Sequence, residues 1–212
     1  MKKIKSLLLL SAVLLTVILL ASWSNKENLL NANTIEETNP QETAGKIFVK
    51  YKNGTVVTFQ SLKLVKGLFS SPHLLADGKV KINPSEILAY QNEQHYAISQ
   101  TLLADGRKSA VSVETLPGFA IRLVNGRLNI YCKKFLNGSL PVDEYFVQLG
   151  YDGKIQKYSP ELMKSLIKDD EQALGFFSEK LNVLENLSLL QSTASLYNKS
   201  ILLNQTVALS DK

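Results

Sequence analysis

The amino-acid sequence is poor in the residues from which most metal and redox sites are built. Among 212 residues there are one cysteine and two histidines. One cysteine cannot form an intrachain disulfide, and a zinc site needs three or four closely spaced ligands, so both are excluded. The acidic stretch 168–171 lacks the glycine and alternating acids of a calcium loop and is expected to be a solvated helix junction. No glycine-rich phosphate loop or dinucleotide fingerprint occurs. We expect no metal ion and no cofactor.

The single cysteine has the pattern of a core residue. In a strand, Cys132 would share one face with Leu128 and Ile130. A free cysteine behaves as a small hydrophobic side chain. The sequence therefore predicts a buried, inert thiol rather than a nucleophile.

Motifs for nucleophilic catalysis are also scarce. The Gly-x-Ser-x-Gly motif of serine hydrolases does not occur. His73 follows Ser70 and Ser71 closely enough to suggest a Ser–His pair, but nothing marks the third member of a triad. A His-based hydrolase is therefore disfavoured.

Paired carboxylates are the second enzymatic candidate, because two acids lining a cleft can hydrolyse a glycosidic bond. Glu86 and Glu93 flank an apolar, strand-like stretch, and His95 follows closely. Asp143 and Glu144 precede a further strand. The ordinary role of such acids is solvation at strand ends. We therefore regard Glu86, Glu93 and His95 as weak catalytic candidates whose separation in space decides their use.

Positive charge is concentrated at the N-terminus. The chain has 24 Lys and Arg residues against 19 Asp and Glu residues, a net charge of +5. Lys2, Lys3 and Lys5 lie in a segment without acids; without them, 24 − 3 = 21 cations face 19 anions, a net charge of +2. This excess is too small for a polyanion-binding surface, so we expect no nucleic-acid partner.

A basic start followed by an apolar run is typical of an export signal. Residues 1–5 hold the lysines, and residues 7–21 are almost entirely apolar. We predict a signal peptide over residues 1–24 and hence a periplasmic or secreted protein. The alternative is an uncleaved inner-membrane anchor, although the uncharged stretch is slightly shorter than the ~20 residues of a spanning helix. The membrane would then be contacted through this segment alone.

The rest of the chain divides by composition into four parts. Residues 25–45 are rich in Asn, Glu and Thr and predict a flexible tether. Residues 46–158 have the β-branched and aromatic content of strands and predict a β-rich domain. Apolar residues then recur at helical spacing, which predicts a helical segment over 159–203 and a frayed tail over 204–212.

Six Asn-Gly or Asp-Gly pairs punctuate the β-rich domain. Such pairs accept the positive φ of type I′ turns, so they predict hairpins joined in an antiparallel meander, either sandwich or barrel-like. The six pairs are Asn53-Gly54, Asp77-Gly78, Asp105-Gly106, Asn125-Gly126, Asn137-Gly138 and Asp152-Gly153.

The helical segment begins with clear local signals. Ser159 and Pro160 predict an N-cap followed by the first helical residue, and further helices are predicted over about 170–180 and 184–203. Amphipathic helices normally bury their apolar stripe within their own protein, so we expect these to cover a face of the sheet rather than dock to a partner. The predicted fold class is α+β, with an antiparallel β-rich meander followed by C-terminal helices.

The β-rich domain contains a Pro-Ser-Glu-Ile stretch leading into a strand, and a Gly turn followed by a short strand that ends in Tyr. On these motifs the chain resembles an uncharacterised family of exported bacterial cell-envelope proteins with a β-rich domain. The resemblance covers about residues 46–180 and implies export and a β-rich fold, with no catalytic residue to transfer. The segments that carry it are 51–55, 82–90, 119–131 and 145–146.

Aromatic residues spread through the β-rich domain have two interpretations. An exposed row of them could stack on sugars or peptides, but packing in the core is favoured. We expect a non-enzymatic binding or structural module of the bacterial cell envelope, with an envelope protein or polymer as partner. The alternatives are a hydrolase of envelope polymers and an inner-membrane-anchored accessory protein.

Overall fold

The computed structural model describes residues 34–35, 45–66, 71–106, 112 and 114–210. The predicted signal peptide or anchor over 1–24 lies outside the described residues, as does most of the predicted tether over 25–45. Two residues of that tether form the short strand β1, which pairs with β3. No helix in the described part of the chain is long and apolar enough to cross a membrane.

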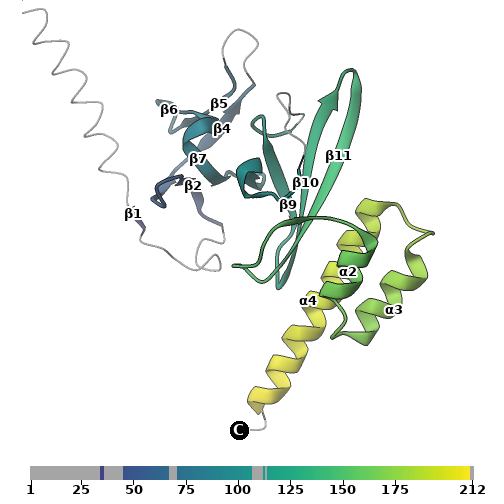
Figure 1. The fold of residues 1–212 in the computed structure, drawn as a ribbon. Helices are drawn as coiled ribbons and strands as arrows, with labels where there is room; N and C mark the ends of the chain where they lie inside the picture. The colour runs from purple at the N-terminus through teal and green to yellow at the C-terminus, as the bar shows by residue number, and fades with distance from the viewer. Residues whose placement is uncertain (1–33, 36–44, 67–70, 107–111, 113, 211–212) are drawn as a thin grey trace, which may run out of the picture.

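Antiparallel strands form two sheets, and this confirms the predicted meander (Figure 1). The larger has nine strands in the order β1 (Thr34–Ile35), β3 (Val56–Phe59), β2 (Ile47–Tyr51), β7 (Ile87–Gln91), β8 (Tyr96–Ser99), β9 (Phe119–Val124), β10 (Leu128–Asn137), β11 (Leu140–Leu149) and β12 (Gln156–Lys157). The smaller consists of β4 (Leu62–Val65), β5 (His73–Ala76) and β6 (Val80–Ile82). Among the described strands β1 and β12 do not pair with each other, so the large sheet is open and the barrel-like alternative does not form.

Most of the predicted turns lie in hairpins. Five of the six Asn-Gly and Asp-Gly pairs lie in, or at the start of, short connections between paired antiparallel strands. Asp77 and Gly78 have φ of 49° and 69°, as a type I′ turn requires. At the Asn53-Gly54 turn only Gly54 has positive φ, so that turn is of another type. Asp105-Gly106 lies in the connection from β8 to β9, and residues 107–111, which would form the second strand of its hairpin, lie outside the described residues, so this hairpin stays a prediction.

The described chain ends in three helices, α2 (Pro160–Leu166), α3 (Glu171–Lys180) and α4 (Asn186–Ser210). Ser159 caps α2 as predicted, because its Oγ accepts the Leu162 N–H at 3.2 Å. Asp170 caps α3 in the same way, through the Ala173 N–H at 2.9 Å. The helix α4 continues through Ser210, beyond the helical segment predicted to end at residue 203.

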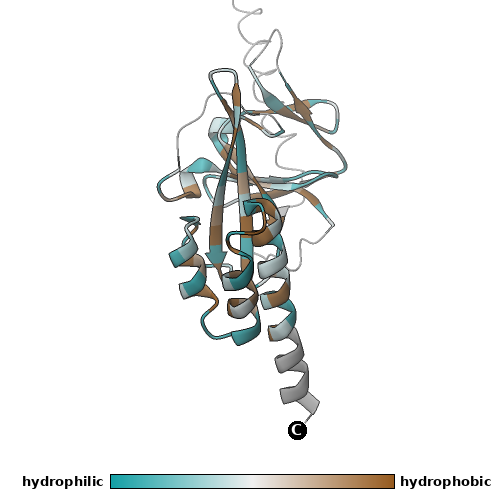
Figure 2. Ribbon diagram, turned by 90° about the vertical axis from the view of Figure 1, so that its right-hand side faces the viewer, coloured by the Kyte–Doolittle hydropathy of each residue, from teal (hydrophilic) through white to brown (hydrophobic). Residues whose placement is uncertain are grey.

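One face of the large sheet is covered by both the small sheet and the helices. Phe119 and Leu123 lie four residues apart in β9 and hence on the same face. Phe119 packs in a core with Leu62 and Leu74 of the small sheet. Leu123 packs against a second core that includes Phe177 of α3. The helices lie beside β10 and β11 (Figure 1), and each contains hydrophobic and hydrophilic residues (Figure 2), as expected of helices that cover a sheet.

Candidate functional site

A cavity of about 590 Å³ lies over the opposite face of the large sheet. It is lined by β2, β3, β7 to β11 and residues 151–155, and its size falls in the range of about 300–1,000 Å³ usual for small-molecule sites. We name it the cationic pocket, after its charged residues. The charged lining residues are Lys50, Arg122, Asp152 and Lys154, and the aromatic ones are Phe48, Tyr96, Tyr131 and Tyr151.

Strand alternation delivers these side chains to the pocket. Successive residues of a strand point to opposite faces of the sheet. In β9, Arg122 therefore points away from the helix-covered face on which Leu123 lies. In β10, Ile130 belongs to the helix-side core, whereas the next residue, Tyr131, lines the pocket. The same strands thus supply a core on one face and a cavity on the other.

Aromatic contacts hold Arg122 in place. Its Cζ lies 4.1 Å from the centroid of the Tyr96 ring, which is a cation–π contact. The Tyr96 ring lies 6.1 Å, centroid to centroid, from Phe48. Burial raises the pKa of both Tyr96 and Tyr131, and the charge of Arg122 opposes that shift. Both phenols are therefore neutral at physiological pH.

A buried glutamine holds residues 151–155, which form one wall of the pocket. Gln148 Oε1 accepts the Tyr131 hydroxyl at 2.8 Å. Its Nε2 donates to the carbonyl oxygens of Tyr151 and Gly153 at 2.9 and 2.8 Å. A side chain at position 153 would overlap the carbonyl oxygen of Leu149, so glycine is required there. The wall is thus anchored to the sheet by three hydrogen bonds through one side chain.

Among the described residues, the three cations of the pocket have no ion-pair partner of opposite charge. In the described part of the chain, Lys50, Arg122 and Lys154 form no ion pair with a carboxylate. The described lining residues include one carboxylate, Asp152, so their excess is 3 − 1 = 2 positive charges. Lys50 and Arg122 are half-buried. Like charges gathered in a concave site focus a positive potential, which attracts anions.

The structure does not bring Glu86 and Glu93 together. Glu86 ends the short helix η1 (Pro84–Glu86) and accepts a hydrogen bond from Asn83 at 3.0 Å. Glu93 lies beyond the other end of β7. At about 3.3 Å per residue, the intervening strand separates them by roughly 20 Å, whereas paired glycosidase carboxylates lie about 5–9.5 Å apart. Neither residue lines the pocket.

The third candidate, His95, belongs to a turn. Its Nε2 lies 3.0 Å from the hydroxyl of buried Tyr90, and its backbone N–H donates to Asn92 Oδ1 at 2.8 Å. Burial lowers the pKa of His95, and the negative charge of Glu114 opposes that shift. His95 does not line the pocket either, so its contacts hold the connection between β7 and β8.

The other nucleophile candidates also lack catalytic geometry. His73 Nδ1 lies 2.9 Å from the carbonyl oxygen of Ser71; because a carbonyl only accepts, this nitrogen is the one that donates. Ser70 lies outside the described residues. Cys132 is buried, as predicted, and burial raises the pKa of its thiol to about 12. A thiol with such a pKa is not a thiolate at neutral pH.

A buried ion cluster replaces the solvated acid predicted at position 144. Glu144 is the direct cross-strand partner of Lys133 in the β10–β11 ladder. Its two oxygens lie 3.2 Å from Lys133 Nζ and 3.0 Å from Lys157 Nζ. Lys133 is 1% exposed and Glu144 is 6% exposed, so the prediction was wrong. Across the described residues, no group of three His, Cys, Asp or Glu side chains could hold a metal ion.

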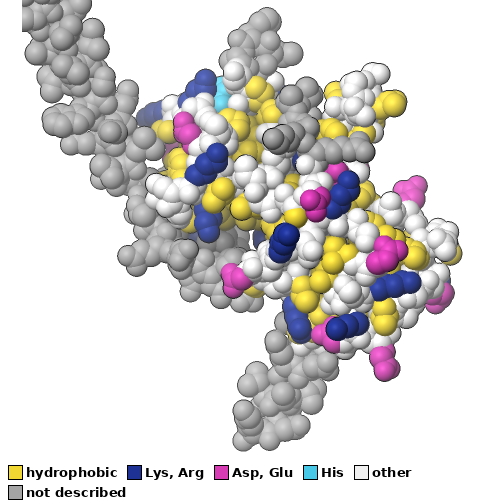
Figure 3. All heavy atoms as spheres, in the orientation of Figure 1, with side chains coloured by type: hydrophobic (Ala, Val, Ile, Leu, Met, Phe, Trp, Pro, Cys, Tyr) yellow, Lys and Arg dark blue, Asp and Glu magenta, His cyan; other side chains and the backbone are white. Residues whose placement is uncertain are grey.

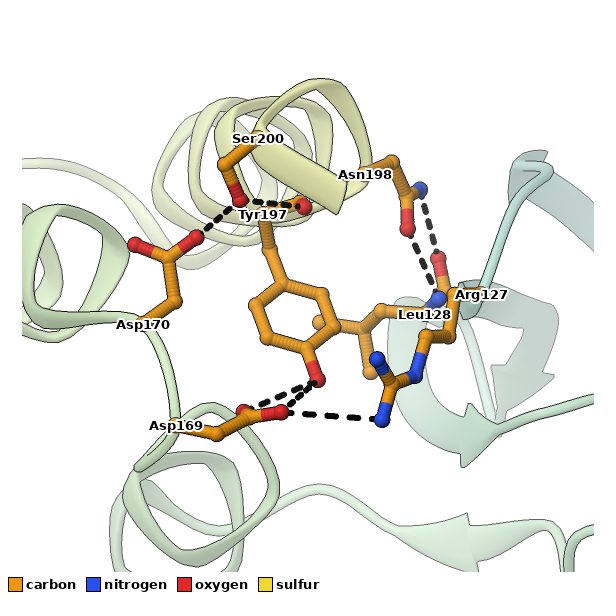
Figure 4. A network of polar contacts seen from close by, with 7 residues as sticks. All are labelled: Arg127, Leu128, Asp169, Asp170, Tyr197, Asn198 and Ser200. Carbon is orange, nitrogen blue, oxygen red and sulfur yellow. Dashed lines mark hydrogen bonds and ion pairs between the residues drawn. The ribbon is translucent and has the colours of Figure 1, made fainter. Parts of the chain in front are cut away.

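A polar network, which we name the helix clamp, joins α4 to the sheet (Figure 4). Asn198 accepts the Leu128 N–H at 2.8 Å and donates to the Leu128 carbonyl oxygen at 3.0 Å. The Tyr197 hydroxyl donates to Asp169 at 3.0 Å, and Asp169 pairs with Arg127 at 3.5 Å. These bonds are internal to the fold, so the helix clamp is structural.

Sequence reasoning missed the helix clamp. It treated residues 168–171 as a solvated junction, yet Asp169 bonds to Tyr197, and Ser200 donates a hydrogen bond to Asp170. One signal was available, because Asp170 occupies the N-cap position of α3. The contacts with α4 carry no local signal, since about 30 residues separate the partners.

Comparison with known proteins finds no relative of this chain. No family model, curated protein or solved structure matches it. The resemblance to exported envelope proteins therefore stays an expectation, and function is inferred from the cationic pocket itself.

Proposed function

We propose that the protein is an exported, non-enzymatic binding module of the cell envelope that holds an anionic ligand in the cationic pocket. The observation that carries this proposal is that Lys50, Arg122 and Lys154 surround one cavity without a carboxylate partner among the described residues. Lys50 and Arg122 are half-buried, and burial of a cation costs free energy unless the cation is paired. An anionic ligand would supply the missing charge-assisted hydrogen bonds.

The geometry of the pocket supports binding with little rearrangement. Arg122 is stacked on Tyr96, and Gln148 anchors the wall. Groups that are already held in place lose less conformational entropy when a ligand binds. The lining holds one carboxylate, Asp152, whereas glycoside hydrolysis uses two, which favours binding over hydrolysis.

The sequence of residues 1–24 supports export, as does the resemblance to envelope proteins. Cell fractionation with N-terminal sequencing tests it. We expect a mature chain that begins at Asn25 and is found in the periplasm or medium. A membrane-bound chain that retains Met1 would favour the anchored accessory protein, and an intact cytosolic chain would overturn export.

Isothermal titration of the mature chain tests the binding function. The probes are tetragalacturonate and tetraglutamate at low ionic strength, because salt screens exposed charges. We expect at least one probe to bind. Arg122→Gln should weaken that binding about tenfold or more, because a hydrogen bond to a charged group contributes about 1.5–3 kcal/mol.

The matched control is Arg127→Gln, which removes the same charge from the same hairpin outside the pocket. Its affinity should equal that of the wild type. Equal losses in the two variants, or no binding of either probe, would overturn the proposal. Shortening of tetragalacturonate during incubation would contradict the non-enzymatic assignment.

A further inference from the structure

The chemistry of the cationic pocket points to one class of anion. Building on the proposed function, we infer that the ligand is an acidic saccharide, a sugar chain with carboxylates on its units. Three features of the pocket lead to this class: its place on the sheet, its rim tyrosine and its stacked guanidinium.

The pocket lies over the middle of the sheet and not at its edge. The strands β2, β7, β8, β9 and β10 each have a hydrogen-bonded neighbour on both sides. Proteins that recognise an extended peptide through its main chain commonly offer it a free strand edge. Here the backbone groups of the pocket strands are already used in the sheet. A ligand must therefore be held by side chains, which does not favour a peptide.

The polar side chain at the base of the wall is also occupied. Gln148 uses its amide oxygen for Tyr131 and both amide hydrogens for backbone carbonyls. An amide has two N–H donors, so none is left for a ligand. Rings and cations are therefore the groups that remain for recognition.

Tyr151 provides a ring at the rim. It is 36% exposed and belongs to the wall that Gln148 anchors, between the sheet and Lys154. The face of an aromatic ring is apolar and carries partial negative charge. The C–H face of a sugar ring is apolar and weakly positive, so the two surfaces complement each other. A sugar can thus stack on Tyr151 without a hydrogen bond to the main chain.

Arg122 suits a carboxylate in particular. One face of its guanidinium lies against the Tyr96 ring, with Cζ 4.1 Å from the ring centroid. A guanidinium has five N–H donors in one plane, so a fork remains for a bidentate carboxylate. Lys50 and Lys154 lie on other elements around the cavity, where they could meet acids on neighbouring sugar units.

The closing experiment compares three tetramers on the mature chain by isothermal titration. Tetragalacturonate should bind at least about tenfold more tightly than tetraglutamate, and also than the neutral cellotetraose. The first comparison tests the need for sugar rings, and the second tests the need for carboxylates. In Arg122→Gln, the affinity for tetragalacturonate should fall close to the affinity for cellotetraose.

Tyr151 gives the second measurement. Tyr151→Ala should weaken tetragalacturonate binding about three- to tenfold, and the matched variant Tyr151→Phe, which keeps the ring, should retain affinity. Tighter binding of tetraglutamate, with loss in Arg122→Gln, would overturn the saccharide inference and leave the proposed function standing. An unchanged affinity in Tyr151→Ala would also overturn it. If no acidic tetramer binds, both fail.

Discussion

Two arginines near the turn between β9 and β10 each stack on a tyrosine ring, but their charges are treated differently. In the helix clamp, Arg127 Cζ lies 5.8 Å from the Tyr197 ring centroid, and the guanidinium pairs with Asp169. In the cationic pocket, Arg122 lies 4.1 Å from Tyr96 and pairs with no described carboxylate. Arg127, which joins the sheet to the helices, is thus paired with a carboxylate. Arg122, which faces the cavity, has no such partner among the described residues.

The two regions are opposite faces of the same strands. On the helix side, acidic and basic side chains are intermixed over the surface (Figure 3), and the interior is an apolar cluster. On the pocket side, cations outnumber acids. Burial of apolar area is the main source of stability. The helix side should therefore determine whether the protein folds, and the pocket side what it binds.

We expect the greatest loss of stability from a substitution on the helix side. Phe177 is fully buried in the cluster between α3, α4 and the sheet. Phe177→Ala should lower the free energy of unfolding by about 3–5 kcal/mol, because it removes buried apolar area and leaves a cavity. Urea unfolding followed by circular dichroism measures this change.

Val183 provides the control for that experiment. It lies between α3 and α4 and is 72% exposed, so Val183→Ala should change the free energy of unfolding by no more than about 0.5 kcal/mol. Equal losses of stability in both variants would contradict the claim that the helix side determines folding. A folded Phe177→Ala variant with weaker ligand binding in the pocket would contradict the claim that the pocket side alone determines binding.

An intermediate effect is expected in the helix clamp. Asn198 satisfies both backbone groups of Leu128. Asn198→Ala should cost about 1–3 kcal/mol, because it leaves a donor and an acceptor without their partner. Asn198→Asp keeps the acceptor for the N–H but opposes the carbonyl with a negative charge. In thermal unfolding, the melting temperature of Asn198→Asp should also be lower than that of the wild type. If both variants melt at the wild-type temperature, the helix clamp does not contribute to stability.

The two arginines should also differ, by a small amount, in how salt changes their contribution to stability. Arg127→Gln removes an attraction between half-exposed groups, so its cost, within about 1 kcal/mol, should shrink as salt is added. Arg122→Gln removes a cation that lies among other cations. Salt screens that repulsion in the wild type, so the stability of the wild type relative to Arg122→Gln should rise with salt.

Urea midpoints measured across a salt series test the two signs. The difference in urea midpoint between the wild type and the variant should fall with salt for Arg127→Gln and rise with salt for Arg122→Gln. The same slope for both would mean that Arg122 has an acidic partner in solution, and it would remove the observation on which the pocket proposal depends.

Local signals were predictable where neighbouring residues decide the structure. The N-cap at Ser159 and the type I′ turn at Asp77-Gly78 depend on a few adjacent residues, and both were predicted correctly. Asp105-Gly106 has the same residues, but residues 107–111, which follow it, lie outside the described part of the chain, so a hairpin there stays a prediction. Glu144 was predicted to be solvated. Its partner Lys133 lies on the preceding strand, and their pairing depends on the register of the hairpin, which the local sequence does not show.

The candidate site was predictable only in outline. The sequence allowed an aromatic surface that could contact sugars but favoured the core, and it proposed Glu86, Glu93 and His95, none of which lines the pocket. Lys50, Arg122 and Lys154 were not singled out, because they lie far apart in the chain and each resembles an ordinary surface cation.

The α+β class, the order of strands before helices and most turn positions were predictable from the sequence, because periodicity, capping and turn chemistry act over a few residues. Which cations meet and which acids are paired depends on the tertiary structure. Sheet register and strand alternation set those distances, and both follow from contacts between residues that are remote in sequence.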